Sequence, residues 1–413
     1  MQTFRVEPLR VLSVLGTRPE AIKMAPVVRE LADRPGVVSR VCVTGQHREM
    51  LDDVLALFRI DPDHDLDVMR PGQTLHGASA QILLGLEAVL ERERPDWVLV
   101  QGDTTTAAIG AVAAFYAGVR IAHVEAGLRS NTPREPFPEE ANRRIAAAVT
   151  DLHFAPTARA RRNLLREGVP AEAIAVTGNP VIDALRIARD VPLPPSSPVS
   201  ALPHDRRLLL VTVHRRESIG APLVAVCEAL DELTRRLPDI GVVFPVHPNP
   251  PVRRIVRAVL ADNPAVTLLE PLGYREIVSL LDRCEIVLTD SGGLQEEAPA
   301  LGRPVLVLRS VTERAEGVEA GTVRLIGTAT ERIVHEVTTL LGSPGEVAMM
   351  SQVVNPYGDG QAAHRIVSRL LGQEIDEWLP GQPERRALVS PRANVGPLGA
   401  AAKPALTLSP PII

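Results

Sequence analysis

The sequence predicts an α/β protein with two doubly wound parallel sheets, and three observations support this prediction. The chain has 413 residues, which is too long for one ordinary hydrophobic core and favours two domains. Short apolar strands alternate with helical patterns, an order that is typical of parallel sheets with right-handed crossovers. A proline-rich stretch without periodicity, residues 191–205, separates two such series and is interpreted as a linker.

These patterns give the expected domain boundaries. We expect an N-terminal domain over residues 1–190 and a C-terminal domain over residues 206–358, joined by the linker at 191–205. A helix within residues 359–372 is expected to pack back on the N-terminal domain. Residues 373–413 are rich in Pro, Ala and Gly without a period, so this tail is predicted to be largely disordered.

Composition and charge exclude several classes of protein. A hydrophobic content of 45% and a charged content of 23% are typical of a soluble globular protein. The net charge of -5 and the pI near 6.1 argue against a nucleic-acid partner. We find neither a signal peptide nor a membrane-spanning apolar run, and therefore expect a cytoplasmic protein without a membrane partner. Cys42, Cys227 and Cys284 are widely spaced in apolar patterns, which indicates buried thiols rather than disulfides or metal ligands.

The second series of elements is organised around a turn between a strand and a helix. Residues 286–288 predict a buried strand, and the Ser-Gly-Gly turn at 291–293 precedes a helix that begins near Leu294. Glycines allow close approach of the backbone to a ligand, and amides at a helix start favour an anion, so the turn is a candidate phosphate cradle. Glu297, one turn further, could accept hydrogen bonds from both ribose hydroxyls. Alternatively, the turn is ordinary and Glu296 and Glu297 form a solvated helix face.

The first strand ends where a doubly wound sheet usually binds ligands. The strand Arg10–Leu15 leads into Gly16 and then into a helix that carries Arg18 and Lys23 near its start. Only one glycine is present, so this is not a dinucleotide-binding fingerprint. Spacing alone leaves open whether the two cations bind a ligand or are solvated.

Carboxylates follow two later strands of the same series. Asp103 follows the strand at 95–100, and Glu125 follows the strand at 120–124. Both should therefore lie at one edge of the sheet, where crowded carboxylates shift one another's pKa values and can exchange protons. The alternative for Asp103 is a helix N-cap, because threonines and a helix follow it.

Further charged residues have both a functional and a structural interpretation. Glu139 and Arg143 are spaced i to i+4, which would also fit a plain ion pair on one helix face. His214 follows the strand at 207–213, and Arg314 lies in a charged loop where it could reach a ligand or be solvated. The residues alone suit a nucleotide diphosphate that the C-terminal half holds while its attached group reacts in the N-terminal half.

Longer stretches resemble a known family, the non-hydrolysing bacterial UDP-N-acetylglucosamine 2-epimerases. The matching stretches are GTRPEAIKMAP, QHREML, QGDTTTA, HVEAGLRS, PFPEEANRR, TGNPVIDAL, VTVHRRES, PVHPNP, LTDSGGLQEEAPALGRPVLVLR, TERAEGVEAGTVRLIGT and NPYGDGQAAHRI. They run from Leu12 to about Leu371 in the family's order. The resemblance implies the GT-B architecture, in which two Rossmann-like domains enclose the active site in their cleft.

The resemblance also implies an activity. It is the reversible interconversion of UDP-GlcNAc and UDP-ManNAc, without a cofactor and without a metal, by elimination of UDP to a 2-acetamidoglucal and its re-addition. The positions that match the family's catalytic residues are Asp103, Glu125, Glu139 and His214. Those that match its substrate-binding residues are Arg18, Lys23, Arg143, Ser291, Gly292, Gly293, Glu297 and Arg314. We further expect a homodimer.

Bacterial members of this family can carry a second, regulatory UDP-GlcNAc beside the substrate. The matching polar positions are Gln46, Gln73, Arg215 and His247. The chain departs from the family's pattern at residues 133–136, which read Pro-Arg-Glu-Pro, and at Gly72. The resemblance therefore supports the catalytic site more strongly than the regulatory one.

Three other functions remain as alternatives. A hydrolysing epimerase would release free ManNAc and UDP from the same substrate. A GT-B glycosyltransferase would use a UDP-sugar but would need an acceptor groove and has no use for three convergent acids. A nucleotide-sugar-binding regulator would bind without turnover.

Overall fold

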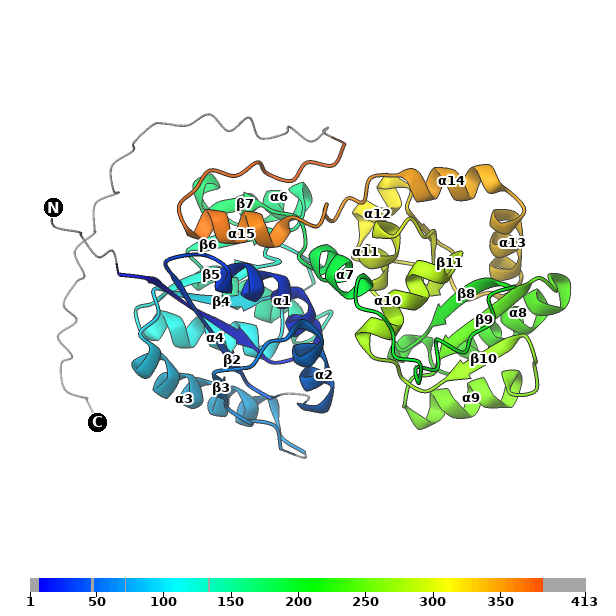
Figure 1. Ribbon diagram of the computed structural model, residues 1–413, viewed down its shortest axis with the longest axis horizontal. Helices are drawn as coiled ribbons and strands as arrows, with labels where there is room; N and C mark the ends of the chain where they lie inside the picture. The colour runs from blue at the N-terminus through cyan, green and yellow to red at the C-terminus, as the bar shows by residue number, and fades with distance from the viewer. Residues whose placement is uncertain (1–6, 46–47, 71, 133, 382–413) are drawn as a thin grey trace. The chain divides into compact units, whose positions relative to one another are not determined.

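The computed structural model describes residues 7–45, 48–70, 72–132 and 134–381 (Figure 1). The described residues up to Pro380 form one compact unit, and the description below concerns that unit. No helix within the described ranges is long and apolar enough to cross a bilayer. Residues 382–413, most of the tail expected to be disordered, lie outside the described residues.

The first sheet takes all its strands from the N-terminal half. Over the described residues it has seven parallel strands in the order β3-β2-β1-β4-β5-β6-β7. The strands are β1 (Leu9–Leu15), β2 (Val37–Val43), β3 (His64–Asp65), β4 (Trp97–Gln101), β5 (Arg120–Val124), β6 (Leu152–Ala155) and β7 (Ile174–Val176). The helices are α1 (Arg18–Ala32), α2 (Arg48–Phe58), α3 (Leu75–Glu93), α4 (Thr105–Tyr116), α5 (Glu139–Val149), α6 (Ala158–Arg166), η1 (Ala171–Ala173) and α7 (Val181–Arg189).

The second sheet takes its strands from the C-terminal half. In the described part of the chain it has six parallel strands in the order β10-β9-β8-β11-β12-β13. These are β8 (Arg207–Thr212), β9 (Ile240–Pro245), β10 (Val266–Leu269), β11 (Ile286–Thr289), β12 (Val305–Val307) and β13 (Val323–Leu325). The helices are η2 (Arg216–Ser218), α8 (Ala221–Arg236), α9 (Pro250–Leu260), α10 (Tyr274–Arg283), α11 (Leu294–Ala300), α12 (Ala315–Ala320), α13 (Thr330–Leu341), α14 (Pro344–Gln352) and α15 (Ala362–Leu370).

The predicted fold class, an α/β protein with two parallel sheets, is confirmed. Strands such as β4 and β11 are buried along their whole length, as expected when helices cover both faces of a parallel sheet. In each sheet the strand order reverses at the first strand of its series, between β1 and β4 and between β8 and β11. Such a reversal opens a crevice at the carboxyl ends of the strands, where ligands bind in this class of fold.

Two elements of the fold are very short. Residues 60–74 include the edge strand β3, and residues 310–321 include the helix α12. Both elements are so short that little periodicity marks them. Near the end of the described chain, Trp378 donates its backbone N–H to Val176 O at 2.8 Å and its indole N–H to Pro356 O at 3.0 Å. The first of these bonds covers part of the open edge of β7, the last strand of the first sheet.

The helices α7 and α15 tie the two halves of the compact unit together. α7 packs against α10 and α11 of the second half, while α15 packs against α1 and α7 of the first. The stretch at 191–205 has two buried apolar side chains, Val199 and Leu202, and Arg283 donates to the carbonyl of Val199 at 2.8 Å. The predicted domain boundaries stay a prediction.

Candidate active site

Glu125 lies at the centre of the polar residues that follow the strands. It comes directly after β5 and has a φ of +64°, a left-handed conformation that is costly for a non-glycine residue and is often found at functional sites. Its carboxylate is 2.5 Å from the Lys23 ammonium and accepts a hydrogen bond from Gln101 at the end of β4. Burial would lower the pKa of Lys23, but Glu125 and Glu296 outweigh burial and raise it.

Arg314 reaches the same carboxylate from the second half of the chain. Its Nη2 atom is 3.8 Å from Glu125 Oε1, and its Nε atom is 2.5 Å from Glu296 Oε1. Asn179, after β7, donates to the other oxygen of Glu296 at 2.6 Å. Burial would lower the pKa of Arg314, but Glu296 and Glu125 raise it above its usual value. The guanidinium therefore stays charged between two buried carboxylates.

Asp103 forms a second carboxylate–cation pair at the end of the neighbouring strand. Its Oδ2 atom is 2.5 Å from Arg143 Nη2, and its carbonyl accepts from Asn142 at 2.9 Å. The alternative of a plain ion pair between Glu139 and Arg143 is wrong, because Arg143 contacts Glu140 Oε2 at 3.0 Å instead. Glu139 Oε2 is buried and has no hydrogen-bond partner. The helix N-cap of α4 is Thr104 and not Asp103, so the alternative role for Asp103 is wrong.

In the second half, the fully buried Asp290 orients His214. Asp290 accepts hydrogen bonds from the backbone of His214 and Arg215 and from the Ser218 hydroxyl, and its Oδ1 atom is 2.9 Å from His214 Nδ1. Burial would raise the pKa of Asp290, but its contacts with His214 and these donors hold it below the usual range.

The Ser-Gly-Gly turn lies between β11 and α11, as predicted. A Cβ atom on Gly292 would be 3.1 Å from Glu313 Oε1, with Arg215 and Arg314 just beyond it, so two guanidinium groups border the turn. One detail differs from the predicted cradle of free amides, because the Ser291 amide already donates to Thr289 Oγ1 at 2.9 Å.

Glu297 is buried, as is Glu296, so the alternative of a solvated helix face is wrong. Burial raises the pKa of Glu297 to about 7. The Tyr274 hydroxyl lies close enough to this carboxylate for each group to influence the pKa of the other. Arg18 lies within electrostatic range of Glu297 and donates to Leu272 O at 3.4 Å.

The regulatory candidates fall in different surroundings. His247 stacks near His214, with ring centroids 6.4 Å apart, and Arg215 Nε donates to Asp290 O at 3.0 Å. Gln73 bonds to Gln81 at 2.7 Å. Gln46 lies outside the described residues.

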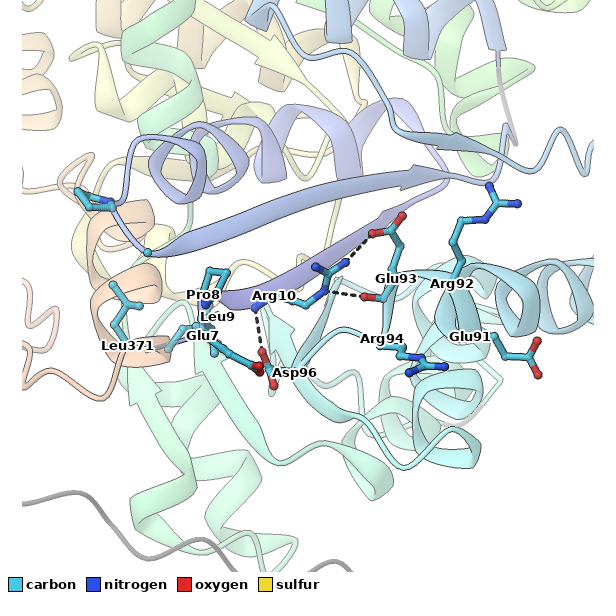
Figure 2. A pocket seen from close by; sticks show the side chains of 13 residues that line it. Glu7, Pro8, Leu9, Arg10, Glu91, Arg92, Glu93, Arg94, Asp96 and Leu371 are labelled. Atoms are coloured by element: carbon cyan, nitrogen blue, oxygen red, sulfur yellow. Dashed lines mark hydrogen bonds and ion pairs between the residues drawn. The ribbon is translucent and has the colours of Figure 1, made fainter. Parts of the chain in front are cut away.

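A pocket at the opposite ends of the strands does not contribute to this site. Its volume is about 1030 Å³, and Figure 2 shows it at the amino ends of β1 and β4. The Arg10 guanidinium on its wall already donates to Glu93, from Nε to the backbone carbonyl at 2.7 Å and from Nη2 to Oε2 at 3.2 Å. The Arg10 backbone N–H donates to Asp96 Oδ2 at 2.9 Å. Within the described part of the chain, no group of three or more His, Cys, Asp or Glu side chains could hold a metal ion.

Comparison with known proteins decides the family. The family model described as UDP-N-acetylglucosamine 2-epimerase matches residues 29–371. The chain belongs to this epimerase family. The UDP-N-acetylglucosamine 2-epimerase of Escherichia coli K12 is 50% identical over 374 residues, which cover 89% of this chain and 100% of that protein.

Solved structures show the same architecture. The Neisseria meningitidis UDP-GlcNAc 2-epimerase, bound to UDP-GlcNAc, matches with a TM-score of 0.82 and 44% identity, covering 88% of this chain and 100% of that one. The kitacinnamycin glycosyltransferase matches with a TM-score of 0.62 at 15% identity, over 89% and 100% of the two chains. The second likeness concerns the fold alone.

Three polar residues of this candidate site were missed by the sequence analysis. Gln101 is the last residue of β4, Asn179 follows β7, and Glu296 lies in the first turn of α11. All three contact Glu125, Arg314 or each other. The rule that found Asp103 and Glu125, namely polar residues at the carboxyl ends of strands, could have found Gln101 and Asn179 too.

Proposed function

We propose that this chain interconverts UDP-GlcNAc and UDP-ManNAc without net hydrolysis, through elimination and re-addition of UDP. The observation that carries the proposal is the meeting of Glu125, Lys23 and Arg314, which brings a carboxylate of the first half against a cation of the second. This arrangement supports proton transfer at a sugar carbon beside a leaving diphosphate.

Carboxylates can remove the proton at C2 as the bond from C1 to the phosphate oxygen lengthens. Positive charge that develops at C1 acidifies this proton, and a nearby carboxylate can accept it. We assign the proton transfers to Glu125, Asp103 and Glu139, with Lys23 and Arg143 holding the first two in place. Return of the proton to the opposite face requires a second acid, which two or more separate carboxylates can provide.

The leaving UDP needs cations and hydrogen-bond donors at its phosphates. We propose that Arg314 and His214 stabilise the charge that develops on the diphosphate, together with the turn of Ser291, Gly292 and Gly293. His214 suits this role because Asp290 fixes its ring. Arg18 and the carboxylate of Glu297 are assigned to the nucleoside end of the ligand.

The test is proton NMR of UDP-GlcNAc with the purified protein in deuterated water. The expected result is deuterium at C2 and the appearance of UDP-ManNAc. Free ManNAc with UDP would instead indicate a hydrolysing epimerase, and binding without exchange would indicate a regulator. Turnover only after addition of a sugar acceptor would indicate a glycosyltransferase.

Affinity for UDP is expected to depend on the charge of Glu297. Its pKa is about 7 in the free protein, and ribose hydroxyls that donate to the carboxylate would lower this pKa in the complex. Binding should therefore be full above pH 7 and weaken as the pH falls below it. Calorimetric titrations between pH 8 and about pH 5.5 can measure this. In Glu297→Gln, the UDP affinity should keep only the pH dependence that the phosphate of UDP contributes. A variant with the same pH profile of affinity as the wild-type protein would contradict the assignment.

We further propose that the chain forms a homodimer through helices of the first half. Leu84 on α3, Phe115 and Tyr116 on α4 and Ile145 on α5 are exposed apolar side chains on helices that pack side by side. A surface of this kind commonly marks a protein–protein interface.

Phe115→Asp is expected to convert the dimer into a monomer, because a carboxylate would be buried without a partner at the interface. Sedimentation equilibrium gives the mass. Met349→Asp, at a similarly exposed apolar side chain on α14, is the matched control and should leave the mass unchanged. A wild-type protein with the mass of one chain would contradict the proposed dimer.

Two finer assignments complete the proposal. We propose that Arg215 and His247, with Gln73 and Gln46, bind a second UDP-GlcNAc that regulates the enzyme. We also propose a cytoplasmic location, because Cys42, Cys227 and Cys284 are buried free thiols, which suit a reducing compartment.

A further inference from the structure

Glu20 is a buried carboxylate that the proposed proton transfers do not use. It lies in the first turn of α1 with 1% of its surface exposed. Its Oε2 atom accepts from the Gly16 amide at 3.1 Å, and its Oε1 atom accepts from the Thr104 hydroxyl at 2.8 Å. Thr17 and Thr104 are the N-cap residues of α1 and α4. One carboxylate therefore links the starts of two helices that are 87 residues apart in the chain, counting from position 17 to position 104.

Capping alone does not explain this burial. A Thr followed three residues later by Glu is a capping box, which serves its helix equally well at the surface. Burying the carboxylate is costly, and the burial raises the pKa of Glu20 to about 7. Hydrogen-bond donors from Gly16, Thr17 and Thr104 compensate for part of this cost. A function for the link between α1 and α4 would explain why the burial is tolerated.

The two linked helix starts carry the residues assigned to chemistry. Lys23, on α1, holds Glu125 at 2.5 Å. Asp103 immediately precedes Thr104 and is held by Arg143 at 2.5 Å. The spacing between α1 and α4 therefore influences the spacing between the two carboxylates.

The turn before α1 touches the first turn of α4 directly. A Cβ atom on Gly16 would overlap the side chain of Thr106 and would lie 2.8 Å from Thr44 Oγ1. The hydroxyls of Thr44 and Thr106 are themselves 2.9 Å apart. A shift of one helix start must therefore disturb the other, and Glu20 is the side chain that bonds to both.

We propose that Glu20 is a positioning residue that fixes the distance between Asp103 and the Lys23–Glu125 pair. The role rests on the proposed function, because it concerns the geometry of proton transfer at C2. Misplacement of a catalytic group by about 1 Å can lower a rate by on the order of 100-fold. The groups assigned to the diphosphate lie mainly in the second half of the chain and should be affected little.

The test compares Glu20→Gln with the wild-type protein. The amide keeps the shape but replaces one acceptor oxygen with a donor, so it cannot accept from both Gly16 and Thr104. We expect kcat for C2 deuterium exchange to fall on the order of 10- to 100-fold. The Kd for UDP should stay within about twofold of the wild-type value. Glu30→Gln, at a partly exposed ion pair on the same helix, is the matched control and should exchange like the wild-type protein.

A second pair of variants tests the Thr104 hydroxyl, and the melting temperature separates positioning from general destabilisation. Thr104→Val removes the hydroxyl that donates to Glu20 and that also caps α4 by accepting from Ala107 N, and it should lower kcat in the same way. Thr104→Ser restores both bonds and should restore the rate. The proposal is overturned if Glu20→Gln exchanges at the wild-type rate. It is also overturned if kcat and UDP affinity fall in parallel with the melting temperature, or if Thr104→Ser is as slow as Thr104→Val. Absence of exchange in the wild-type protein would instead refute the proposed function.

Discussion

Glu125→Gln is expected to lower the rate of C2 hydrogen exchange by on the order of 10²- to 10⁴-fold, the contribution of a well-placed general base. The amide fits the same space but cannot accept the proton. In the variant, the amide would also face Lys23, which in the wild-type protein bonds to the Glu125 carboxylate at 2.5 Å. The groups assigned to UDP remain in place, so UDP should bind with nearly unchanged affinity.

The measurement is the NMR exchange assay, with calorimetry for UDP. Asp103→Asn should behave in the same way if the second carboxylate returns the proton. The matched control is Glu87→Gln, which replaces an exposed carboxylate on α3 and should exchange at the wild-type rate. Normal turnover by both Glu125→Gln and Asp103→Asn would rule out the assignment of proton transfer to these residues.

The alternation of strands and helices was the most predictable part of the fold. Buried parallel strands are continuous apolar runs, and the polar residues that end them stand out in the sequence. This contrast was enough to locate Asp103, Glu125 and His214 at the ends of their strands. It failed for β3, which has only two residues, because so short a strand leaves no pattern to detect.

Burial and pairing of the site residues were less predictable, because they depend on distant parts of the chain. Glu296 could be interpreted as a solvated helix residue, yet its partner Asn179 is 117 positions away. The spacing of Arg143 and Glu139 also fitted an ion pair between them, but the Arg143 guanidinium bonds to Glu140 and to Asp103, which is 40 positions away. Local spacing predicts only the partners that a residue would have on an isolated helix.

Arg314→Met is expected to destabilise the fold by about 3–5 kcal/mol at neutral pH, the usual loss when one partner of a buried ion pair is removed. Methionine fills similar space but leaves the carboxylates of Glu296 and Glu125 without this cation. The loss can be measured as the shift in the denaturant midpoint between the variant and the wild-type protein, when the slope of the unfolding free energy against denaturant is unchanged. Epimerisation should also be lost, because the cation assigned to the departing diphosphate is gone.

The pH dependence of this variant and a double variant identify the cause of the destabilisation. Burial and the charge of Glu125 already raise the pKa of Glu296, and Arg314 opposes this rise. Without Arg314 the pKa of Glu296 should rise further, so its folded state binds a proton that the unfolded state releases. Stability should then recover as the pH falls from 8 towards about 5, the range in which the folded protein holds the additional proton.

Arg314→Met combined with Glu296→Gln removes this buried charge and should regain much of the lost stability at neutral pH without regaining epimerisation. A double variant no more stable than Arg314→Met would show that lost packing, and not the uncompensated carboxylate, accounts for the effect.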